Sequence, residues 1–467
     1  MILTLALRSL LAHPVRSAVL AAGFGLGVSV MAILLGVGRV VLEQARAPEL
    51  VGGGDVLVTG QSGEVTAARV LLAGTLATAP LGAWTRAASP WSRETLYLLG
   101  DKGPLPVRAR GGIPTLEKAL GDPEIAGQPW HDTAADSSWT APAPDDLLRA
   151  VDGFHPIPDV PERRSSWAEW LYFNGRAADA RFYLTFLVGP PDERDRSRRR
   201  VAGVRLQLDR GGTVETFSAS ALLSDEEVAR APELTIANNG VRLEGGRYRL
   251  SLDLRGSRGR RVTGVLVLGG SPNRLLPPIE IFGAGGWRTG YVVPVMAGAL
   301  DGSLLVDGTP VTFENGTGYH DHNWGFWEGV SWQWGQVQHG DMSFVYGRVF
   351  PPREAADPER MPGFLGALGP DGPLGYATNV TIEETNNTSG RPERIVIRGR
   401  HAGLDLTLTF SVAAAVVNRS EGGLRAASLD FLQLQGTYDV RGRVGDRQVA
   451  FTAPGAAETF RGAPPRR

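Results

Sequence analysis

Residues 318–334 read Gly-Tyr-His-Asp-His-Asn-Trp-Gly-Phe-Trp-Glu-Gly-Val-Ser-Trp-Gln-Trp. This stretch holds two of the seven histidines and four of the eleven tryptophans of the chain. It places acidic, basic and large aromatic side chains together, as in an apolar ligand pocket with a few polar groups or in acid catalysis on an apolar substrate. Because side chains alternate along a strand, we expect Trp332, Trp334 and Gln336 to share one face.

A second aromatic strand is expected directly afterwards, because the run from Met342 to Phe350 follows a turn at 339–341. Its alternate residues from Met342 to Arg348 would share a face. If both faces point into a barrel, two outcomes stay open: the rings line a ligand cavity, or they fill the barrel as core. The predicted ligand-binding residues are the aromatic and basic side chains of these strands: Trp332, Trp334, Phe344, Tyr346 and Arg348.

The same pattern occurs earlier in the chain. Ser166-Trp167 opens a strand that turns near Gly175 and returns through Arg181–Val188 into two prolines, as the later strands do. From Trp167 onward, short alternating runs are separated by Gly, Asp, Asn or Pro, which is typical of antiparallel sandwiches and barrels. The repeat therefore predicts an all-β chain with two tandem barrels, residues 151–316 and 317–467.

Two motifs carry a family resemblance. The run Gly318–Gly325 and the run Glu169-Trp170-Leu171-Tyr172-Phe173-Asn174-Gly175 resemble the hydroxyneurosporene synthase (carotenoid 1,2-hydratase) and AttH-like family. Leu171 is a departure, since the family usually has Trp there. Weaker similarity covers Gly290–Pro294 and Ala456–Phe460. The resemblance implies two lipocalin-like antiparallel β-barrels, in a family that contains both enzymes and proteins with no assigned activity.

The resemblance also implies a candidate chemistry, the hydration of an isoprenoid alkene without a cofactor. Asp321 or His322 would donate the proton, and the rings of Trp324 and Tyr346 would shelter the carbocation. The hydratases are expected to carry a Tyr-x-Asp pair on the next strand, whereas this chain has Tyr346-Gly347-Arg348 there. Arginine does not act as an acid at ordinary pH, so this departure disfavours hydratase activity.

Metal binding was weighed for the same stretch. His320 and His322 would share a face of a strand, and His339 or Asp341 could supply a third ligand. The chain has no cysteine, and no glutamate clearly converges on the pair. We therefore expect no metal and no cofactor, and instead a buried hydrogen-bonded network of the two histidines with Asp321.

The N-terminal region, residues 1–47, is expected to anchor the chain in a membrane. Ser17–Gly38 contains no charged residue and is long enough to span a bilayer core of about 30 Å. A cleaved signal peptide is the alternative, with an Ala-x-Ala-like site at Ala45–Ala47. Residues 3–40 also resemble the first membrane helix of an FtsX/MacB-type ABC transporter permease, which implies a link to an export system. We expect a single-pass protein of the cytoplasmic membrane with its bulk on the periplasmic side.

Residues 48–150 form a lead-in region of mixed character. Strand-like runs occur at Asp55–Thr59 and Thr95–Leu99, and helices are expected at Pro114–Gly121 and Asp145–Val151, the last capped by Asp145. The net charge of -1 gives no signal for a nucleic-acid partner.

Three functions remain open on the sequence. The leading one is a membrane-anchored protein that binds a hydrophobic small molecule, such as a lipid or isoprenoid, and serves an ABC exporter. The alternative is the carotenoid hydratase, and the third is a structural scaffold with filled barrels.

Overall fold

The computed structural model describes residues 81–100, 103–178, 180–270, 275–370, 372–401, 403–418 and 431–460, with short pieces at 12, 14–15, 56–59, 65 and 68–76. The expected anchor at Ser17–Gly38 lies outside the described residues. Within them, none of the helices combines the length and apolar character needed to cross a bilayer. The chain divides into two compact units, Met1–Gly60 with Ala87–Thr133, and Gln61–Arg86 with Ala134–Arg467.

The first unit contains a hairpin and one helix. Strands β1 (Trp91–Gly100) and β2 (Gly103–Gly112) pair antiparallel, and β1 includes the expected strand at Thr95–Leu99. Residues 56–59 belong to no helix or strand, so the strand expected there is wrong. Helix α4 (Pro114–Leu120) confirms the predicted helix: it begins with proline and ends at Gly121, whose φ of 78° suits glycine.

The second unit begins with short helices that lead to the barrel, and α6 (Pro144–Asp152) is the one that matters for the site. The sequence predicted that Asp145 caps α6, but the side chain of Asp145 does not cap it. Its carboxylate instead accepts hydrogen bonds from the backbone N–H groups of Gly245 and Gly246, while Leu148 enters the barrel core. The other helical segments before the barrel are α3 (Ala68–Val70), η1 (Leu71–Leu76), η2 (Leu81–Ala83), α5 (Ala134–Thr140) and η3 (Arg164–Ser166).

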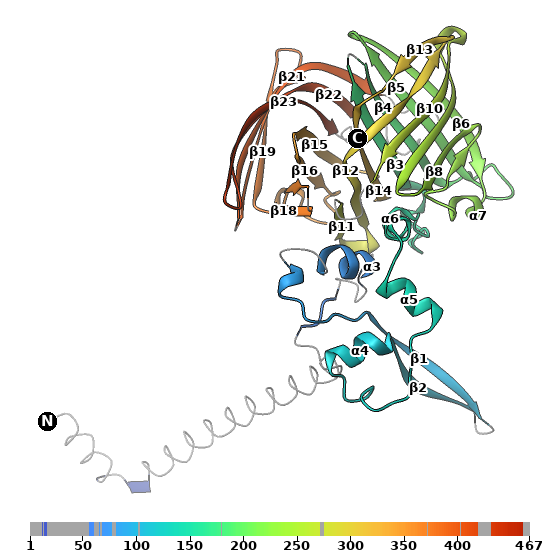
Figure 1. Cartoon of the computed structure of the whole chain (residues 1–467), viewed down its shortest axis with the longest axis vertical. Helices are drawn as coiled ribbons and strands as arrows, with labels where there is room; N and C mark the ends of the chain where they lie inside the picture. The colour runs from blue at the N-terminus through green and yellow to red at the C-terminus, as the bar shows by residue number, and fades with distance from the viewer. Residues whose placement is uncertain are drawn as a thin grey trace. The chain divides into compact units, whose positions relative to one another are not determined.

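An eight-stranded antiparallel barrel follows, in the order β10-β12-β14-β3-β4-β5-β6-β9, and pairing of β9 with β10 closes it (Figure 1). Its strands are β3 (Trp167–Ala177), β4 (Ala180–Pro191), β5 (Arg200–Arg210), β6 (Thr213–Leu223), β9 (Arg247–Gly256), β10 (Arg261–Gly269), β12 (Arg288–Val306) and β14 (Gly316–Phe326). Shorter elements join its ends: α7 (Asp225–Val228), β7 (Thr235–Ile236), β8 (Asn239–Glu244), η4 (Ser257–Gly259), β11 (Leu276–Phe282), η6 (Ala284–Gly286) and β13 (Thr309–Thr312).

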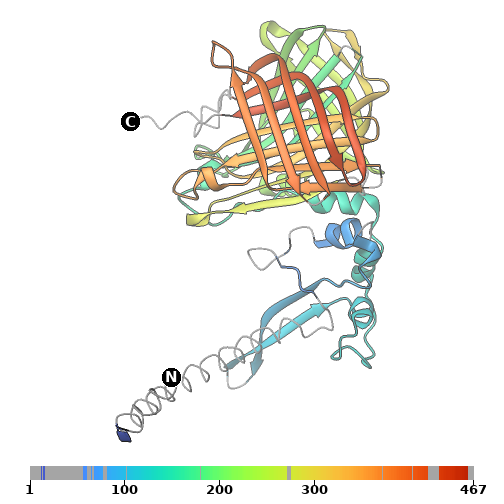
Figure 2. The ribbon, with the colours of Figure 1, turned by 90° about the vertical axis from the view of Figure 1, so that its left-hand side faces the viewer.

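The remaining strands form one open nine-stranded antiparallel sheet, in the order β18-β17-β16-β15-β23-β22-β21-β20-β19. The sheet curls into a half-barrel beside the barrel (Figure 2). Its strands are β15 (Ser331–His339), β16 (Met342–Phe350), β17 (Phe364–Gly369), β18 (Gly372–Ala377), β19 (Val380–Asn386), β20 (Pro392–His401), β21 (Leu404–Asn418), β22 (Phe431–Val444) and β23 (Arg447–Phe460), with η7 (Pro358–Arg360) after β16.

The fold therefore differs from two closed barrels in two respects. The second sheet stays open because its edge strand β18 is short and begins Gly372-Pro373, and proline lacks the N–H that a further partner strand would need. The expected boundary at 316–317 falls at the start of β14, which is a barrel strand between β12 and β3. The barrel sheet thus runs to Phe326, and the half-barrel begins at Ser331.

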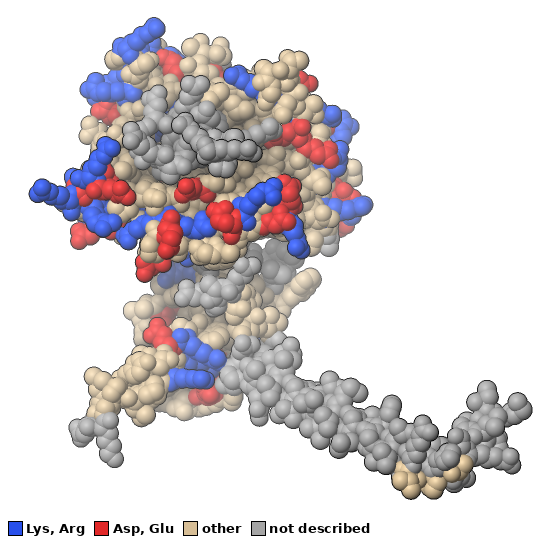
Figure 3. Space-filling model, turned by 180° about the vertical axis from the view of Figure 1, so that it is seen from behind, with Lys and Arg blue, Asp and Glu red and all other residues tan. Residues whose placement is uncertain are grey.

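Both sheets bury an apolar core of their own. The barrel interior is packed with rings and aliphatic side chains, among them Phe173, Phe186 and Tyr248. The concave face of the half-barrel is packed in the same way, around Phe344, Tyr346 and Tyr438. On the outer surface seen in Figure 3, acidic and basic side chains are intermixed instead of gathered by sign.

Candidate functional site

Strand β14 sends its side chains to two different places. His320 points into the barrel, where its ring stacks on Phe173 at a centroid distance of 4.0 Å. Tyr319 points outward, and its ring lies 5.4 Å from that of Trp334 in the half-barrel. The expected network of both histidines with Asp321 is therefore wrong, because Asp321 shares the outward face of Tyr319 while the histidines share the inward face.

The inward face carries the first histidine of a buried ion-pair network. His320 Nε2 lies 2.7 Å from Asp152 Oδ2, and its Nδ1 lies 2.9 Å from the carbonyl oxygen of Tyr172. A carbonyl oxygen only accepts, so Nδ1 donates in the contact with Tyr172. Burial raises the pKa of Asp152, but the charge and hydrogen bond of His320 outweigh burial and hold that pKa below its usual value.

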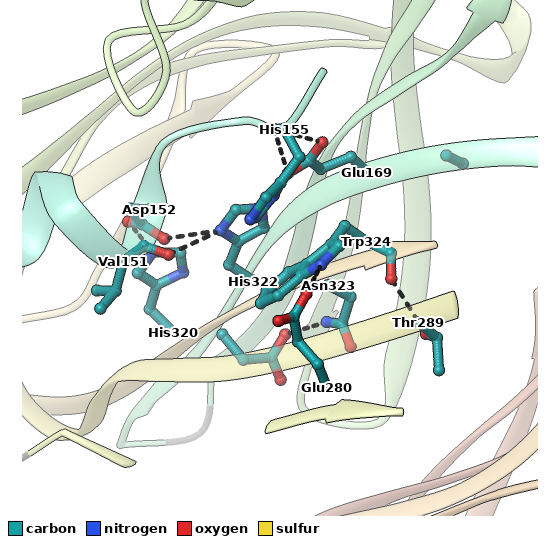
Figure 4. A network of polar contacts seen from close by, with 12 residues as sticks. Val151, Asp152, His155, Glu169, Glu280, Thr289, His320, His322, Asn323 and Trp324 are labelled. Atoms are coloured by element: carbon teal, nitrogen blue, oxygen red, sulfur yellow. Dashed lines mark hydrogen bonds and ion pairs between the residues drawn. The ribbon is translucent and has the colours of Figure 1, made fainter. Parts of the chain in front are cut away.

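His322 repeats the arrangement with a different carboxylate (Figure 4). Its Nε2 lies 2.8 Å from Glu169 Oε1, and its Nδ1 lies 3.2 Å from the carbonyl oxygen of Val151. His155 adds a ring contact of 2.7 Å and a backbone N–H to the same carboxylate. Burial raises the pKa of Glu169, but the hydrogen bonds from the two histidines hold it below its usual value.

Three of these groups could hold a metal ion. His155 Nδ1, Glu169 Oε1 and His322 Nε2 all lie within 4.8 Å of one another. The contacts to Glu169 have the lengths of charge-assisted hydrogen bonds, and the other ring nitrogen of His322 lies against a carbonyl oxygen, that of Val151. The geometry therefore favours an ion-pair network that ties α6 and the segment after it to β3 and β14.

The outward face of β14 carries a directed hydrogen-bond chain that ends at Asp321. Trp334 Nε1 donates to Tyr291 Oη at 2.9 Å, and Tyr319 Oη donates to Asp321 Oδ2 at 3.0 Å. The two tyrosine oxygens lie 2.6 Å apart, so the proton between them comes from Tyr291. Asn323 Nδ2 donates to the other carboxylate oxygen at 2.8 Å. The chain links the half-barrel to the barrel and fixes the orientation of Asp321.

A cavity of about 1120 Å³ opens beside this chain. It lies between the outer face of the barrel, from β12 across to β6, and the face of β15, β16 and β23 that is turned away from the half-barrel core. Its volume lies slightly above the range of about 300–1,000 Å³ usual for small-molecule sites. Six rings line the end next to Asp321: Trp170, Tyr172, Tyr291, Trp327, Trp332 and Trp334.

Two carboxyl groups face this cavity, one from each sheet. Burial raises the pKa of Asp321 well above its usual value, and the charge of Glu458 adds to the effect. Burial also raises the pKa of Glu458, to about 7, although hydrogen bonds from Trp332 and Tyr172 oppose it. Glu458 keeps some accessible surface, which is cavity surface because the residue lines the cavity. Acids with raised pKa values in a cleft are typical of functional sites.

The predicted ligand-binding residues fall into two groups. Trp332 and Trp334 line the cavity, and so does Arg348, whose guanidinium donates to the carbonyl oxygens of Pro358 and Glu359. Phe344 and Tyr346 belong to the half-barrel core instead. The expected shared face is wrong, because Trp334 pairs with Gly347 in the sheet while Tyr346 pairs with Gly335.

The four residues considered for catalysis are not brought together either. Asp321 lines the cavity, His322 and Trp324 lie on the opposite face of β14, and Tyr346 lies in the core of the other sheet. The residues that sequence reasoning missed are Asp152, His155, Glu169, Tyr291 and Glu458. Glu169, Tyr291 and Glu458 were visible in the motifs that carry the family resemblance, and those motifs converge on this region.

Comparisons with known proteins give a limited result. No family model matches the chain, and no curated protein matches it. A crystal structure of a protein provisionally named AttH from Nitrosomonas europaea is similar with 12% identity and a TM-score of 0.42, over 66% of this chain and 94% of that one. The structure of CghA with Sch210972 is similar with 12% identity and a TM-score of 0.40, over 68% and 95%. At these values, the similarity says nothing about a ligand or an activity.

Proposed function

We propose that the protein binds an apolar small molecule in the cavity between the barrel and the half-barrel. The observation that carries the proposal is the cavity itself, which combines a volume of about 1120 Å³ with a wall of aromatic rings and few polar groups at that end. Apolar pockets with a small number of oriented polar groups are the usual form of such sites. The barrel interior, where lipocalin-like barrels hold ligands, is packed with side chains in this protein.

Replacing Trp332 with alanine is expected to weaken the binding of a neutral apolar dye, such as Nile red, by about tenfold. Trp332 is half-buried and lines the cavity, so its loss removes contact area from the ligand. Titration of the full chain followed by dye fluorescence measures the effect.

The matched control is Tyr346→Ala, because Tyr346 is 1% exposed in the half-barrel core. That variant is expected to lose about 3–5 kcal/mol of stability while its folded fraction binds the dye as before. If Trp332→Ala lowers the melting temperature as much as Tyr346→Ala and leaves dye binding intact, the ring of Trp332 is part of a packed core and the ligand binds outside this cavity.

The proposal includes attachment to the cytoplasmic membrane through Ser17–Gly38, with the second unit on the periplasmic side and an ABC exporter as a partner. The uncharged sequence of that segment and its resemblance to a permease helix support this part. Fractionation tests it: the full chain is expected to stay in the membrane pellet after a carbonate wash, and its release would contradict the anchor.

One observation favours a second function, the hydration of an isoprenoid alkene. Burial raises the pKa of Asp321 well above its usual value, which favours the protonated carboxyl that could give its proton to an alkene carbon beside the cavity rings. Water would then add to the tertiary cation and return its proton to the carboxylate. The cation would be sheltered by Trp334 and Tyr291, since Trp324 and Tyr346 face away from the cavity.

Incubation of the full chain with an acyclic carotenoid in heavy-oxygen water separates the two functions. The binding proposal expects no label in any product. Label that appears in a hydroxylated product and disappears with Asp321→Asn would establish the hydratase. Label that survives Asp321→Asn would establish hydration with another proton donor, for which Glu458, the other carboxyl group that faces the cavity, is the candidate.

A further inference from the structure

We propose that the end of the cavity between Asp321 and Glu458 binds the positively charged group of an apolar amine or quaternary ammonium compound. This inference rests on the proposed binding function and names the class of ligand.

The two carboxyl groups lack a cation. Asp321 accepts hydrogen bonds from Tyr319 and Asn323, and Glu458 from Trp332, Tyr172 and Gln433. Among the described residues, no Lys, Arg or His forms an ion pair with either group. This differs from the inward face of β14, where each buried carboxylate has a histidine. A buried carboxylate without a counter-charge is costly, and a bound cation would remove that cost.

Several aromatic rings line the cavity near these carboxyl groups. Trp170 and Trp332 lie 6.3 Å apart between centroids, and Tyr172 meets Trp334 edge to face at 5.8 Å. These rings come from both sheets, so they flank a ligand from two sides. Aromatic faces attract ammonium groups through their quadrupoles, and cages of this kind recognise quaternary ammonium ligands. Rings and carboxylates together select a cation over a neutral group.

The charge along the cavity is uneven. The carboxyl end lies at β14 and β23, whereas the lining arginines of the barrel, Arg205, Arg255 and Arg260, lie on β5, β9 and the turn after it. The lining arginine of the half-barrel, Arg348, donates to the carbonyl oxygens of Pro358 and Glu359. Strand β5 is three strands from β14 in the barrel order, which corresponds to about 14 Å. Leu187 and Val201 line the part between them. A ligand would therefore place its cation at the carboxyl end and its apolar part along β4 and β5.

Binding of a permanent cation is expected to strengthen as the pH rises through about 7, because Glu458 ionises there. The titratable groups facing Glu458 are Asp321 and the tyrosines Tyr172, Tyr183 and Tyr291. Burial raises the pKa values of these tyrosines, so they stay neutral in this range. Burial raises the pKa of Asp321 as well, so its ionisation would add to the effect.

The test compares two probes of equal chain length, octyltrimethylammonium and 1-octanol, by calorimetric titration of the full chain held in amphipol. At pH 8, the ammonium probe is expected to bind about tenfold more tightly than the alcohol, and the preference is expected to shrink at pH 5.5. Glu458→Gln and Asp321→Asn are expected to reduce the preference, which is the ratio of the two affinities, about tenfold. A tenfold change corresponds to about 1.4 kcal/mol.

Glu383→Gln serves as the control, because Glu383 is exposed and paired with Arg398 outside the cavity. If octanol binds but the ammonium probe is not preferred, or if both carboxyl variants keep the preference, the cation proposal is overturned and the binding function stands. If neither probe binds the wild-type chain, both proposals fail. Melting curves of the two variants establish that each is folded.

Discussion

Replacing Glu169 with glutamine is expected to lower the free energy of unfolding by about 3–5 kcal/mol, the usual cost of removing one partner of a buried ion pair. Glu169 accepts hydrogen bonds from His322 Nε2, His155 Nδ1 and the His155 backbone N–H. A glutamine oxygen can replace one acceptor, but the amide NH₂ group then faces the remaining donors. The fully buried imidazole of His322 would lose its nearer carboxylate and keep only Asp152, whose Oδ1 lies 3.5 Å from its Nδ1.

Urea denaturation at pH 7 measures this loss, with Glu383→Gln as the exposed control, for which about 0–1 kcal/mol is expected. Asp152→Asn should behave like Glu169→Gln, because it removes the partner of His320. Equal stabilities for Glu169→Gln and Glu383→Gln would mean that the network does not hold α6 to the barrel. The pKa values of Asp152 and Glu169 are lowered in the folded state, so their contribution is present above their ordinary values of 3.8 and 4.5 and is lost as the pH falls.

The contribution of Glu458 to stability is expected to depend on pH in the opposite direction from the contributions of Asp152 and Glu169, and Glu458→Gln tests this. The folded state keeps a proton on Glu458 up to about pH 7, whereas the ordinary value is 4.5. The stabilising contribution of this group is therefore complete below about pH 4.5 and is lost as the pH rises to about 7. The difference between 4.5 and 7 corresponds to about 3 kcal/mol at 1.36 kcal/mol per pKa unit.

Denaturation of wild type and variant from pH 4 to pH 8 measures this dependence. The free energy of unfolding of the variant is expected not to decline in this way. The variant therefore becomes more stable relative to the wild type between pH 4.5 and 7. If the stabilities of the two proteins change in parallel with pH, Glu458 titrates near its ordinary value and the carboxyl end of the cavity is solvated.

The strand content was predictable from the sequence, but the faces of the strands were predictable only in part. Alternation correctly separates Tyr319 and Asp321 from His320 and His322, yet it does not reveal which face looks into the barrel. Whether Trp334 and Tyr346 share a face depends on the length of the turn between β15 and β16. His339 pairs with Met342, so the loop has two residues, and even-numbered residues of β15 then share a face with odd-numbered residues of β16. A three-residue loop would have given the expected arrangement.

The partners of the histidines could not be derived from their own strand. Asp152 lies on α6 and meets His320 only because Leu148 and the contacts of Asp145 seat that helix on the barrel end. Glu169 and Glu458 lie in quoted motifs, but their roles depend on neighbouring strands: Trp324 pairs with Glu169, and Trp334 pairs with Glu458. From the family resemblance, the cavity was expected inside a barrel. The structure has a packed core there, and the cavity lies outside the barrel.

Photoaffinity labelling with a diazirine-bearing aliphatic alcohol tests the central claim most directly, because it reports where an apolar ligand sits in the full chain. The expected adducts, mapped by peptide mass spectrometry, lie on cavity-lining residues such as Trp170, Tyr291 and Trp332, and excess unlabelled alcohol removes them. Saturable adducts on barrel-interior residues such as Phe186 or Leu206 would contradict the account and place the ligand within the barrel.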